Sequence, residues 1–364
     1  MSRTCVATFA DPISSASDPF LAARAALSAT SPTRPGTDHT PAHLSSPSPP
    51  SPPTAGIWLP NETLSAILGY LSPEALAQVV LVSRRWHAVA ERVLYESIVI
   101  SEAIPRSFPP PYVPPRTLRC CETLANRPHL SLYVRRLHLR WYTSASASSH
   151  HPTSILLLTQ HITHALLPTL ASLASLSLLL PVSSLLSSSD LANLFPSPPP
   201  ALPALRRLTI GGLGDPSPIL LVNPHLLHLH LADTDPSAPP LSLPPDALSE
   251  LRAFRGPIGA AVALLPGRPV QGLALLDTCG TGSRSSGNNS NGGVSSADLA
   301  RLAHASAPLR VLDLGGVSVT PPLLRDVSRY LPHVEHLRVR LALRHTLHFA
   351  LSGIVSPTPT PHPP

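Results

Sequence analysis

Lysine is missing from this chain of 364 residues, so all 26 of its basic residues are arginine. Aromatic residues make up only 4% of the sequence, and the formal net charge is +6. The arginines are scattered rather than gathered in a basic run, and few aromatic rings are present to stack on bases. We therefore expect no nucleic acid partner. Because 43% of the residues are hydrophobic, a core is possible, but leucine, alanine and valine must build it.

Cysteine is also scarce: the chain contains four, Cys5, Cys120, Cys121 and Cys279. Their spacing fits neither a zinc knuckle nor a disulfide framework. The N-terminus lacks the basic flank and apolar core of a signal peptide, so we expect a cytoplasmic or nuclear protein. The sequence has no nucleophile elbow and no phosphate-binding glycine loop, and its 18 histidines lack further ligands at metal spacing. We expect neither an enzyme nor a bound metal or cofactor.

One uncharged stretch tests the expectation of a soluble protein. The segment Ala165–Val182 is about long enough to span a bilayer. It contains Pro168, Pro181 and several serines, which favour a buried helix followed by a buried strand. We therefore expect no membrane span.

Proline, with 47 residues, divides the chain. Residues 1–55 and 351–364 are rich in proline and serine and are predicted to be disordered. A further proline cluster at 105–116 separates two ordered regions, 57–104 and 117–350, and a Gly/Ser/Asn-rich stretch at 280–296 predicts a flexible insertion. The run Pro109–Tyr112 (PPPY) is either a WW-domain ligand or part of a rigid linker.

The first ordered region predicts three short helices. Pro60 suits the first turn of a helix, and Ser72 followed by Pro73 and Glu74 is typical of a second helix start. Apolar residues then recur at helical spacing. They are Leu64, Ile67, Leu68 and Leu71 in the first stripe, and Val82, Trp86, Val89 and Val93 in the third. About forty residues bury too little surface to be stable alone, so we expect apolar surface to remain for a partner.

This pattern resembles the F-box. The resemblance lies in the run Leu59-Pro60-x-Glu62-x-Leu64-x-x-Ile67-Leu68-x-Tyr70-Leu71-Ser72-Pro73, followed by Val82-Ser83-Arg84-Arg85-Trp86. It implies a domain that docks on the Skp adaptor and, through it, on the cullin of a ubiquitin ligase. The residues that the resemblance assigns to this docking surface and its support are Leu59, Pro60, Ile67, Leu71, Leu76, Val82 and Trp86. Leu64, Leu68, Val89 and part of Trp86 are expected to be core. A GC-rich coding bias, which also raises the share of Ala, Pro and Gly, explains the absence of lysine. The alternative is that a ligase subunit without lysine offers no internal amine for ubiquitin attachment.

The second region contains a repeat of the form apolar-x-x-Leu-x-apolar. It begins at Val134, Leu173, Leu205, Leu226, Leu248, Val270, Leu309 and Val334. Alternate residues of a strand face the same side, so the pattern predicts strands joined by helical connectors and stacked as a solenoid. The region resembles the leucine-rich repeats that follow an F-box, and residues 117–139 resemble its opening in fungal F-box proteins. The Asn or Cys of that family is absent after the strand leucines, so we expect no side-chain ladder between turns; a loose helical or α/β domain is the alternative.

The predicted fold is therefore mixed α/β: a three-helix F-box followed by an irregular strand-helix solenoid. Strand residues between the leucines would line its concave face. The candidates for substrate binding on this face are Arg136, His138, Arg206, Arg207, His228, Arg252 and Arg338. Guanidinium groups pair with carboxylate and phosphate in a two-pronged geometry, which favours an acidic or phosphorylated partner; the alternative is an ordinary solvated face. The predicted function is substrate recognition for a Skp–cullin–F-box ligase, or alternatively a protein-interaction scaffold outside a ligase.

Overall fold

The computed structural model describes residues 59–104, 113–143, 152–180, 194–232, 241–244, 246–276 and 294–340. The chain divides into two compact units, Met1–Tyr95 and Glu96–Pro364. The predicted disordered ends, the PPPY run at 109–112 and most of the predicted insertion at 280–296 lie outside the described residues.

The first unit is helical, as predicted. Its helices are α2 (Asn61–Leu68), α3 (Pro73–Val79) and α4 (Arg84–Glu96), the last of which runs into the second unit. Ser72 caps α3, because its hydroxyl accepts a hydrogen bond from the backbone N–H of Ala75 at 3.4 Å. Ser83 precedes α4 and accepts from the N–H of Trp86 at 3.3 Å. Both helix starts therefore satisfy backbone donors that would otherwise lack partners.

The core of this unit is small. Five buried residues form it: Leu64, Leu68, Leu76, Val89 and Ala90. Five partly buried residues pack around them: Val79, Val80, Trp86, Val93 and Leu94. A core of this size contributes little beyond the entropy cost of ordering the chain, so covering its exposed surface with a partner would stabilise it.

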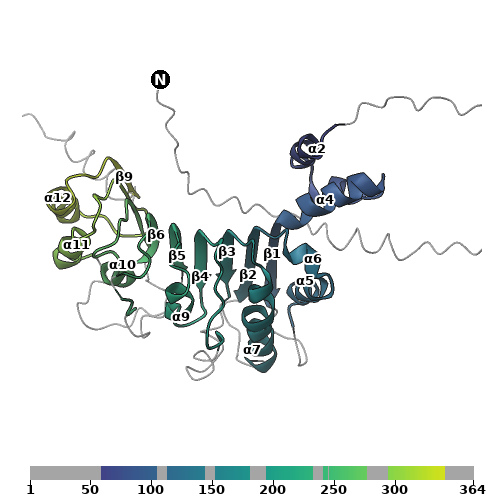
Figure 1. The fold of residues 1–364 in the computed structure, drawn as a ribbon. Coiled ribbons are helices and arrows are strands. Elements are labelled where there is room, and N and C mark those ends of the chain that lie inside the picture. The colour runs from purple at the N-terminus through teal and green to yellow at the C-terminus, as the bar shows by residue number, and fades with distance from the viewer. Residues whose placement is uncertain are drawn as a thin grey trace, which may run out of the picture. The chain divides into compact units, whose positions relative to one another are not determined.

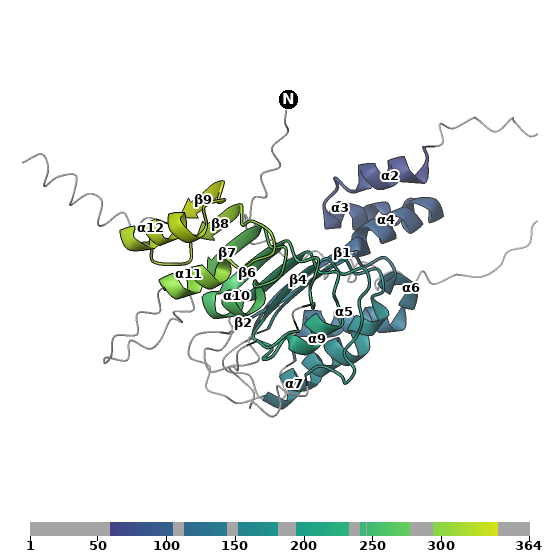
Figure 2. The ribbon, with the colours of Figure 1, turned by 60° about the vertical axis from the view of Figure 1, so that its left-hand side comes forward.

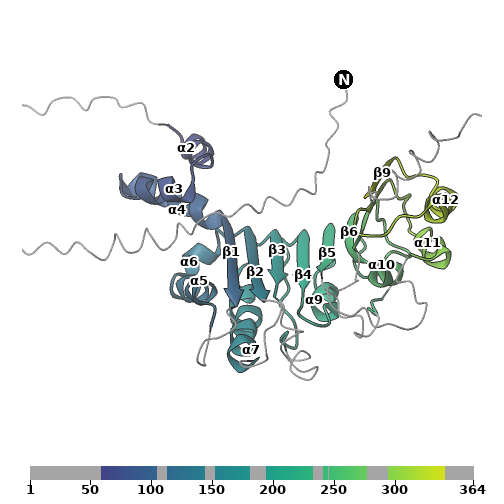
Figure 3. The same cartoon turned by 180° about the vertical axis from the view of Figure 1, so that it is seen from behind.

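The second unit is built on one nine-stranded parallel sheet whose strand order is the chain order. The strands are β1 (Ser97–Ile104), β2 (Arg136–Thr143), β3 (Ser175–Leu179), β4 (Arg207–Gly211), β5 (His228–Ala232), β6 (Ala253–Pro257), β7 (Gly272–Leu276), β8 (Val311–Leu314) and β9 (His336–Val339). Strands β1 to β6 lie side by side in this order in Figures 1 and 3. Parallel neighbours require a crossover connection between each pair of strands.

Helices provide much of this crossover chain. They are α5 (Pro115–Asn126), α6 (Pro128–Ser131), α7 (Pro152–Gln160), η1 (His161–Leu166), η2 (Leu167–Thr169), α9 (Ser217–Leu221), α10 (Ile258–Leu264), α11 (Ser296–Leu302) and α12 (Pro321–Tyr330). Figure 1 shows α5, α7, α9 and α10 following one another along the sheet, and Figure 2 shows α10, α11 and α12 following one another beside β6 to β9. This succession of strands and connectors is consistent with the predicted solenoid.

The predicted strand positions are confirmed for seven of the eight repeats, although Leu337 of the last one, β9, is 45% exposed rather than buried. In β2, for example, Leu137 and Leu139 are buried, whereas Arg136, the first residue of the strand, is exposed. Leu137 pairs with Leu176 of β3, which in turn pairs with Leu208 of β4. The leucines therefore form continuous rows across the sheet, on the side that the helices cover.

One repeat was misplaced and one strand was not predicted. The prediction put Leu251 and Ala253 in the strand, but β6 begins at Ala253, and Phe254 is the buried residue that pairs with Leu229 and Leu273. The bulky Phe254 occupies the core row, while Leu251 is buried in the turn before it. In addition, β1 lies within the segment 57–104 assigned to the F-box, yet it pairs with β2 along its full length and belongs to the sheet.

The uncharged stretch folds as a helix followed by a strand, as predicted. It contains the end of η1, then η2, and then β3, whose Leu176 and Leu178 are buried. Among the helices in the described parts of the chain, none is long and apolar enough to cross a bilayer.

One polar side chain links two successive turns, at a position other than those of the Asn or Cys ladder in the repeat family. Asn223 is buried, and its Oδ1 accepts from the N–H of Leu202 in the preceding turn at 2.8 Å. Its Nδ2 donates to the carbonyl of Ile219 at 2.7 Å. The positions expected from the repeat family indeed lack Asn, but a residue elsewhere in the turn performs the same bridging.

We expect the substitution Asn223→Ala to lower the free energy of unfolding by about 2 kcal/mol, because it leaves a buried N–H and a buried carbonyl without partners. Urea denaturation of the chain measures this change. The matched control is Asn126→Ala at the exposed end of α5, which should change stability by less than about 0.5 kcal/mol. Equal stability of the two variants would show that Asn223 does not stabilise the turns.

Candidate functional site

Large apolar side chains are exposed on the helical unit. Ile67 is 45% exposed at the end of α2, Tyr70 is 92% exposed in the following turn, and Val82 is 67% exposed between α3 and α4. Leu59, Leu71 and Leu81 are exposed as well. So many exposed apolar side chains on a unit with a small core are typical of a protein-binding surface. We call Leu59, Pro60, Ile67, Tyr70, Leu71, Leu81 and Val82 the apolar surface.

Arg85 holds part of this surface in place. Its Nε donates to Oδ1 of Asn61 at 2.9 Å, and its guanidinium also donates to the carbonyl of Leu59. The start of α2, with Leu59 and Pro60, is thereby tied to α4. Sequence reasoning did not assign a role to Arg85, whose only signal was its place in the Val82–Trp86 motif.

The structure divides the seven predicted docking residues into two groups. Leu59, Pro60, Ile67, Leu71 and Val82 are exposed. Leu76 is only 4% exposed, and Trp86 is half-buried against the same core. These last two therefore support the surface from beneath rather than present side chains to a partner, because α3 and α4 turn them toward Leu64 and Leu68.

Residues 58–101 match the F-box-like family. The chain carries an F-box-like domain. The match begins just before α2 and ends within β1, so this domain comprises the three helices and the apolar surface. A comparison with curated proteins finds no match to the chain.

A second candidate surface lies on the sheet unit that follows the F-box-like domain. We call the side of β2–β6 that carries Arg136, Ser175, Arg207 and His228 the open face. The strand register places these four residues at one level, as direct neighbours from β2 to β5. His138 lies two residues after Arg136 on β2 and therefore on the same face. Four of the seven predicted substrate-binding residues are therefore brought together.

The other three predicted residues are placed differently. Arg206 precedes β4, and its Nη1 donates to the carbonyls of Pro203 and Leu205 at 3.1 and 3.2 Å, within its own turn. Arg252 is exposed just before β6. Arg338 lies at the far end of the sheet on β9, where its Nη1 is 3.5 Å from Oδ2 of Asp313.

Positive charge is concentrated on the open face. Burial lowers the pKa of His228, and the charges of Arg207 and Arg252 lower it further. The nearby Glu250 has a pKa below its usual value, chiefly because it accepts a hydrogen bond from His225 at 2.7 Å. At the outward positions of the described strands β2 to β6 there is no acidic residue. Within the described strands, this face therefore carries positive charge from Arg136 and Arg207 with no acidic residue beside it.

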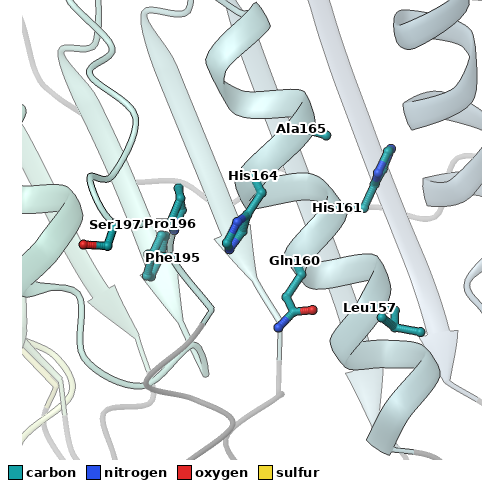
Figure 4. Close-up of a pocket in the computed structure, with 8 residues that line it drawn as sticks. All are labelled: Leu157, Gln160, His161, His164, Ala165, Phe195, Pro196 and Ser197. Atoms are coloured by element: carbon teal, nitrogen blue, oxygen red, sulfur yellow. The ribbon is translucent and has the colours of Figure 1, made fainter.

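A shallow pocket beside η1 has no catalytic arrangement. Its lining residues include Gln160, His161 and His164 on one side and Phe195 and Ser197 on the other. Figure 4 shows the two imidazoles pointing to different sides of the helix, so they do not converge on one ion. Within the described ranges, no group of three or more His, Cys, Asp or Glu side chains is placed to hold a metal.

The adjacent thiols of α5 are not activated. Burial raises the pKa of both Cys120 and Cys121 to about 12. Each remains protonated at neutral pH, whereas a nucleophile or metal ligand requires the thiolate. The two cysteines therefore act as packing residues of the helix.

Proposed function

We propose that this chain is a substrate-recognition adaptor of a Skp–cullin–F-box ubiquitin ligase, acting in the cytoplasm or nucleus. The F-box-like domain docks on the Skp adaptor, which links it to the cullin, and the leucine-rich-repeat-like sheet unit captures a protein target. The chain holds the target near a ubiquitin-conjugating enzyme and contributes no chemistry of its own. The observation that carries this proposal is the F-box-like match over the unit that exposes the apolar surface.

The docking energy comes from covering the apolar surface. Complete burial of a side chain such as Ile67 or Val82 contributes about 1.5–3 kcal/mol, part of which offsets the entropy lost on association. Arg85 lowers that entropy cost because it already orders Leu59 and Pro60 in the free domain. Leu76 and Trp86 keep α3 and α4 packed while the exposed residues make contact.

The deciding experiment is co-purification of the full chain with the Skp adaptor. We expect the wild type to bind and the double variant Ile67→Asp/Val82→Asp to bind at least about 100-fold more weakly, because two carboxylates would be buried without partners. Both positions are exposed in the free chain, so the fold should persist.

A matched control introduces the same charges elsewhere. Leu157 on α7 and Leu221 on α9 are exposed apolar residues of the other unit. The variant Leu157→Asp/Leu221→Asp should still bind the Skp adaptor. A folded wild type that fails to bind, or an Ile67→Asp/Val82→Asp variant that binds as the wild type does, would contradict the proposal.

The F-box-like match is also compatible with a scaffold that binds the Skp adaptor outside a ligase. Deletion of the gene separates the two functions. A ligase adaptor predicts that ubiquitination of a bound target is lost, whereas a scaffold predicts that it is unchanged.

A further inference from the structure

The cationic side chains of the open face form a line that crosses the strands. Arg136 on β2, Arg207 on β4 and His228 on β5 stand at one level of the register. Arg252 stands one residue before that level, next to Ala253, the register partner of His228, and its charge acts on His228. We call these four residues the basic stripe. Neighbouring strands are about 4.8 Å apart, so four steps from β2 to β6 give the stripe a length of about 19 Å.

The stripe differs in charge balance from the far end of the same sheet. At β8 and β9, Arg338 lies 3.5 Å from Asp313, and Arg310 lies 3.7 Å from Glu335. Within the described residues, Arg136 and Arg207 form no such ion pair. Positive charge is therefore compensated near β9, and Glu250 lies close to Arg252 before β6. The charges of Arg136 on β2 and Arg207 on β4 are left for a partner.

We infer that the basic stripe binds an extended acidic segment of a partner protein, rich in Asp or Glu and laid across the strands. An extended peptide advances about 3.3 Å per residue, so about six residues cover the stripe. Alternate residues of such a peptide face the sheet about 6.6 Å apart, whereas Arg136, Arg207 and Arg252 follow one another at two strand spacings, about 9.6 Å. The long side chains of arginine and glutamate can bridge this difference of about 3 Å. The inference rests on the proposed function only in treating that partner as a ligase target.

The spacing favours several carboxylates over one phosphate. Cations stand on separate strands, and Ser175 separates Arg136 from Arg207. A single phosphate concentrates about two charges and three acceptor oxygens at one point, and it is best met by guanidinium groups that converge there. A row of single positive charges is matched by a row of single negative charges.

The test uses three fluorescent peptides of about ten residues, long enough to cross the stripe. In the first, glutamate alternates with serine; in the second, glutamine replaces glutamate; the third has one phosphoserine in the glutamine background. We expect the full chain to bind the glutamate peptide with an affinity that falls by about tenfold or more between 0.05 and 0.5 M salt. The glutamine peptide should not bind, and the phosphoserine peptide should bind more weakly than the glutamate peptide.

Charge reversal locates the site. The variant Arg136→Glu/Arg207→Glu should bind the glutamate peptide at least about tenfold more weakly. The control Arg301→Glu/Arg325→Glu changes net charge equally on exposed positions of α11 and α12, and should bind as the wild type does. An equal loss in both variants, or tighter binding of the phosphoserine peptide, would overturn the inference.

Proton uptake gives a second readout at His228. The groups that face it are Arg207 on β4, Arg252 before β6 and His230 on its own strand, and the two arginines help to keep its pKa below the usual value. A bound carboxylate raises that pKa, so the complex takes up a proton and affinity should rise as pH falls from about 7.5 to about 6. His228→Gln should reduce this rise. An affinity independent of pH in the wild type would contradict the placement of the peptide over His228.

This test is independent of the F-box-like domain. If the Arg136→Glu/Arg207→Glu variant loses the peptide but still co-purifies with the Skp adaptor, the two surfaces act separately, as we infer. Loss of glutamate-peptide selectivity in a chain that binds the adaptor would refute only the inference. Failure of the wild type to bind the adaptor would refute only the proposed function.

Discussion

The substitution Arg268→Met should lower the free energy of unfolding by about 3–5 kcal/mol. Arg268 is only 2% exposed and lies in the turn between α10 and β7. Its Nε donates to the carbonyl of Ala247 at 2.7 Å and its Nη2 to that of Pro244 at 2.8 Å, both in the turn before β6. Its Nη1 donates to the carbonyl of Leu264 at the end of α10. Methionine fills similar space but removes the donors of the Ala247 and Leu264 carbonyls, whereas the carbonyl of Pro244 still accepts from the N–H of Ala247 at 3.1 Å.

Thermal unfolding measures this effect. A loss of this size lowers the melting temperature of a domain of this length by roughly 10 °C. Arg301→Met, at an exposed position on α11, removes the same charge and should leave the melting temperature within about 2 °C of the wild type. If the two variants melt together, Arg268 contributes nothing beyond its net charge.

The substitution Glu102→Ala should lower the free energy of unfolding by about 3–4 kcal/mol. The buried carboxylate of Glu102 on β1 accepts from the N–H groups of Arg116 and Thr117 at 2.7 and 2.9 Å, at the start of α5. It also accepts from the hydroxyl of Thr117 at 2.6 Å, and that hydroxyl accepts from Nε1 of Trp141 on β2 at 3.1 Å. The side chain of Glu102 thus joins β1 to α5 directly, and to β2 through the hydroxyl of Thr117. It also supplies negative charge at a helix N-terminus.

Two further variants separate the contributions of this network. Glu102→Gln retains an acceptor oxygen, so we expect a loss smaller than that of Glu102→Ala. Trp141→Phe removes only the last hydrogen bond, and its cost should be about 1 kcal/mol. Chemical denaturation measures the stability of the three variants. We expect Glu102→Ala to be the least stable, followed by Glu102→Gln and then Trp141→Phe. A loss for Glu102→Ala no larger than that for Trp141→Phe would show that the carboxylate does not hold the network together.

Local periodicity explains why much of the fold could be predicted. The three helices start at proline or at capping serines, and seven strands carry their leucines in the predicted register. Strand β1 escaped notice because Ile98 and Ile100 make only a short alternation directly after a helix. Strand β6 was misplaced because leucines flank it, and only the packed structure shows that Phe254 occupies the core row.

Contacts between distant residues explain what could not be predicted. Asn223 and Arg268 are ordinary polar residues in the sequence, and their roles arise from carbonyls and N–H groups about twenty residues away. In the F-box-like domain, Ile67 and Leu76 are both apolar members of the motif, yet one is exposed and the other is core. Arg206 and Arg207 are neighbours in the sequence, but only Arg207 stands on the strand.

Because strand order equals chain order, each strand touches only its predecessor and its successor in the sheet. Such an architecture can lengthen or shorten in evolution one repeat at a time, since gain or loss of a terminal repeat disturbs a single interface. The end at β9 is the natural place for such change, because its ion pairs with β8 are local to the last two strands. Gain or loss of a repeat beyond β6 would therefore leave Arg136, Arg207 and His228 in their places on β2, β4 and β5.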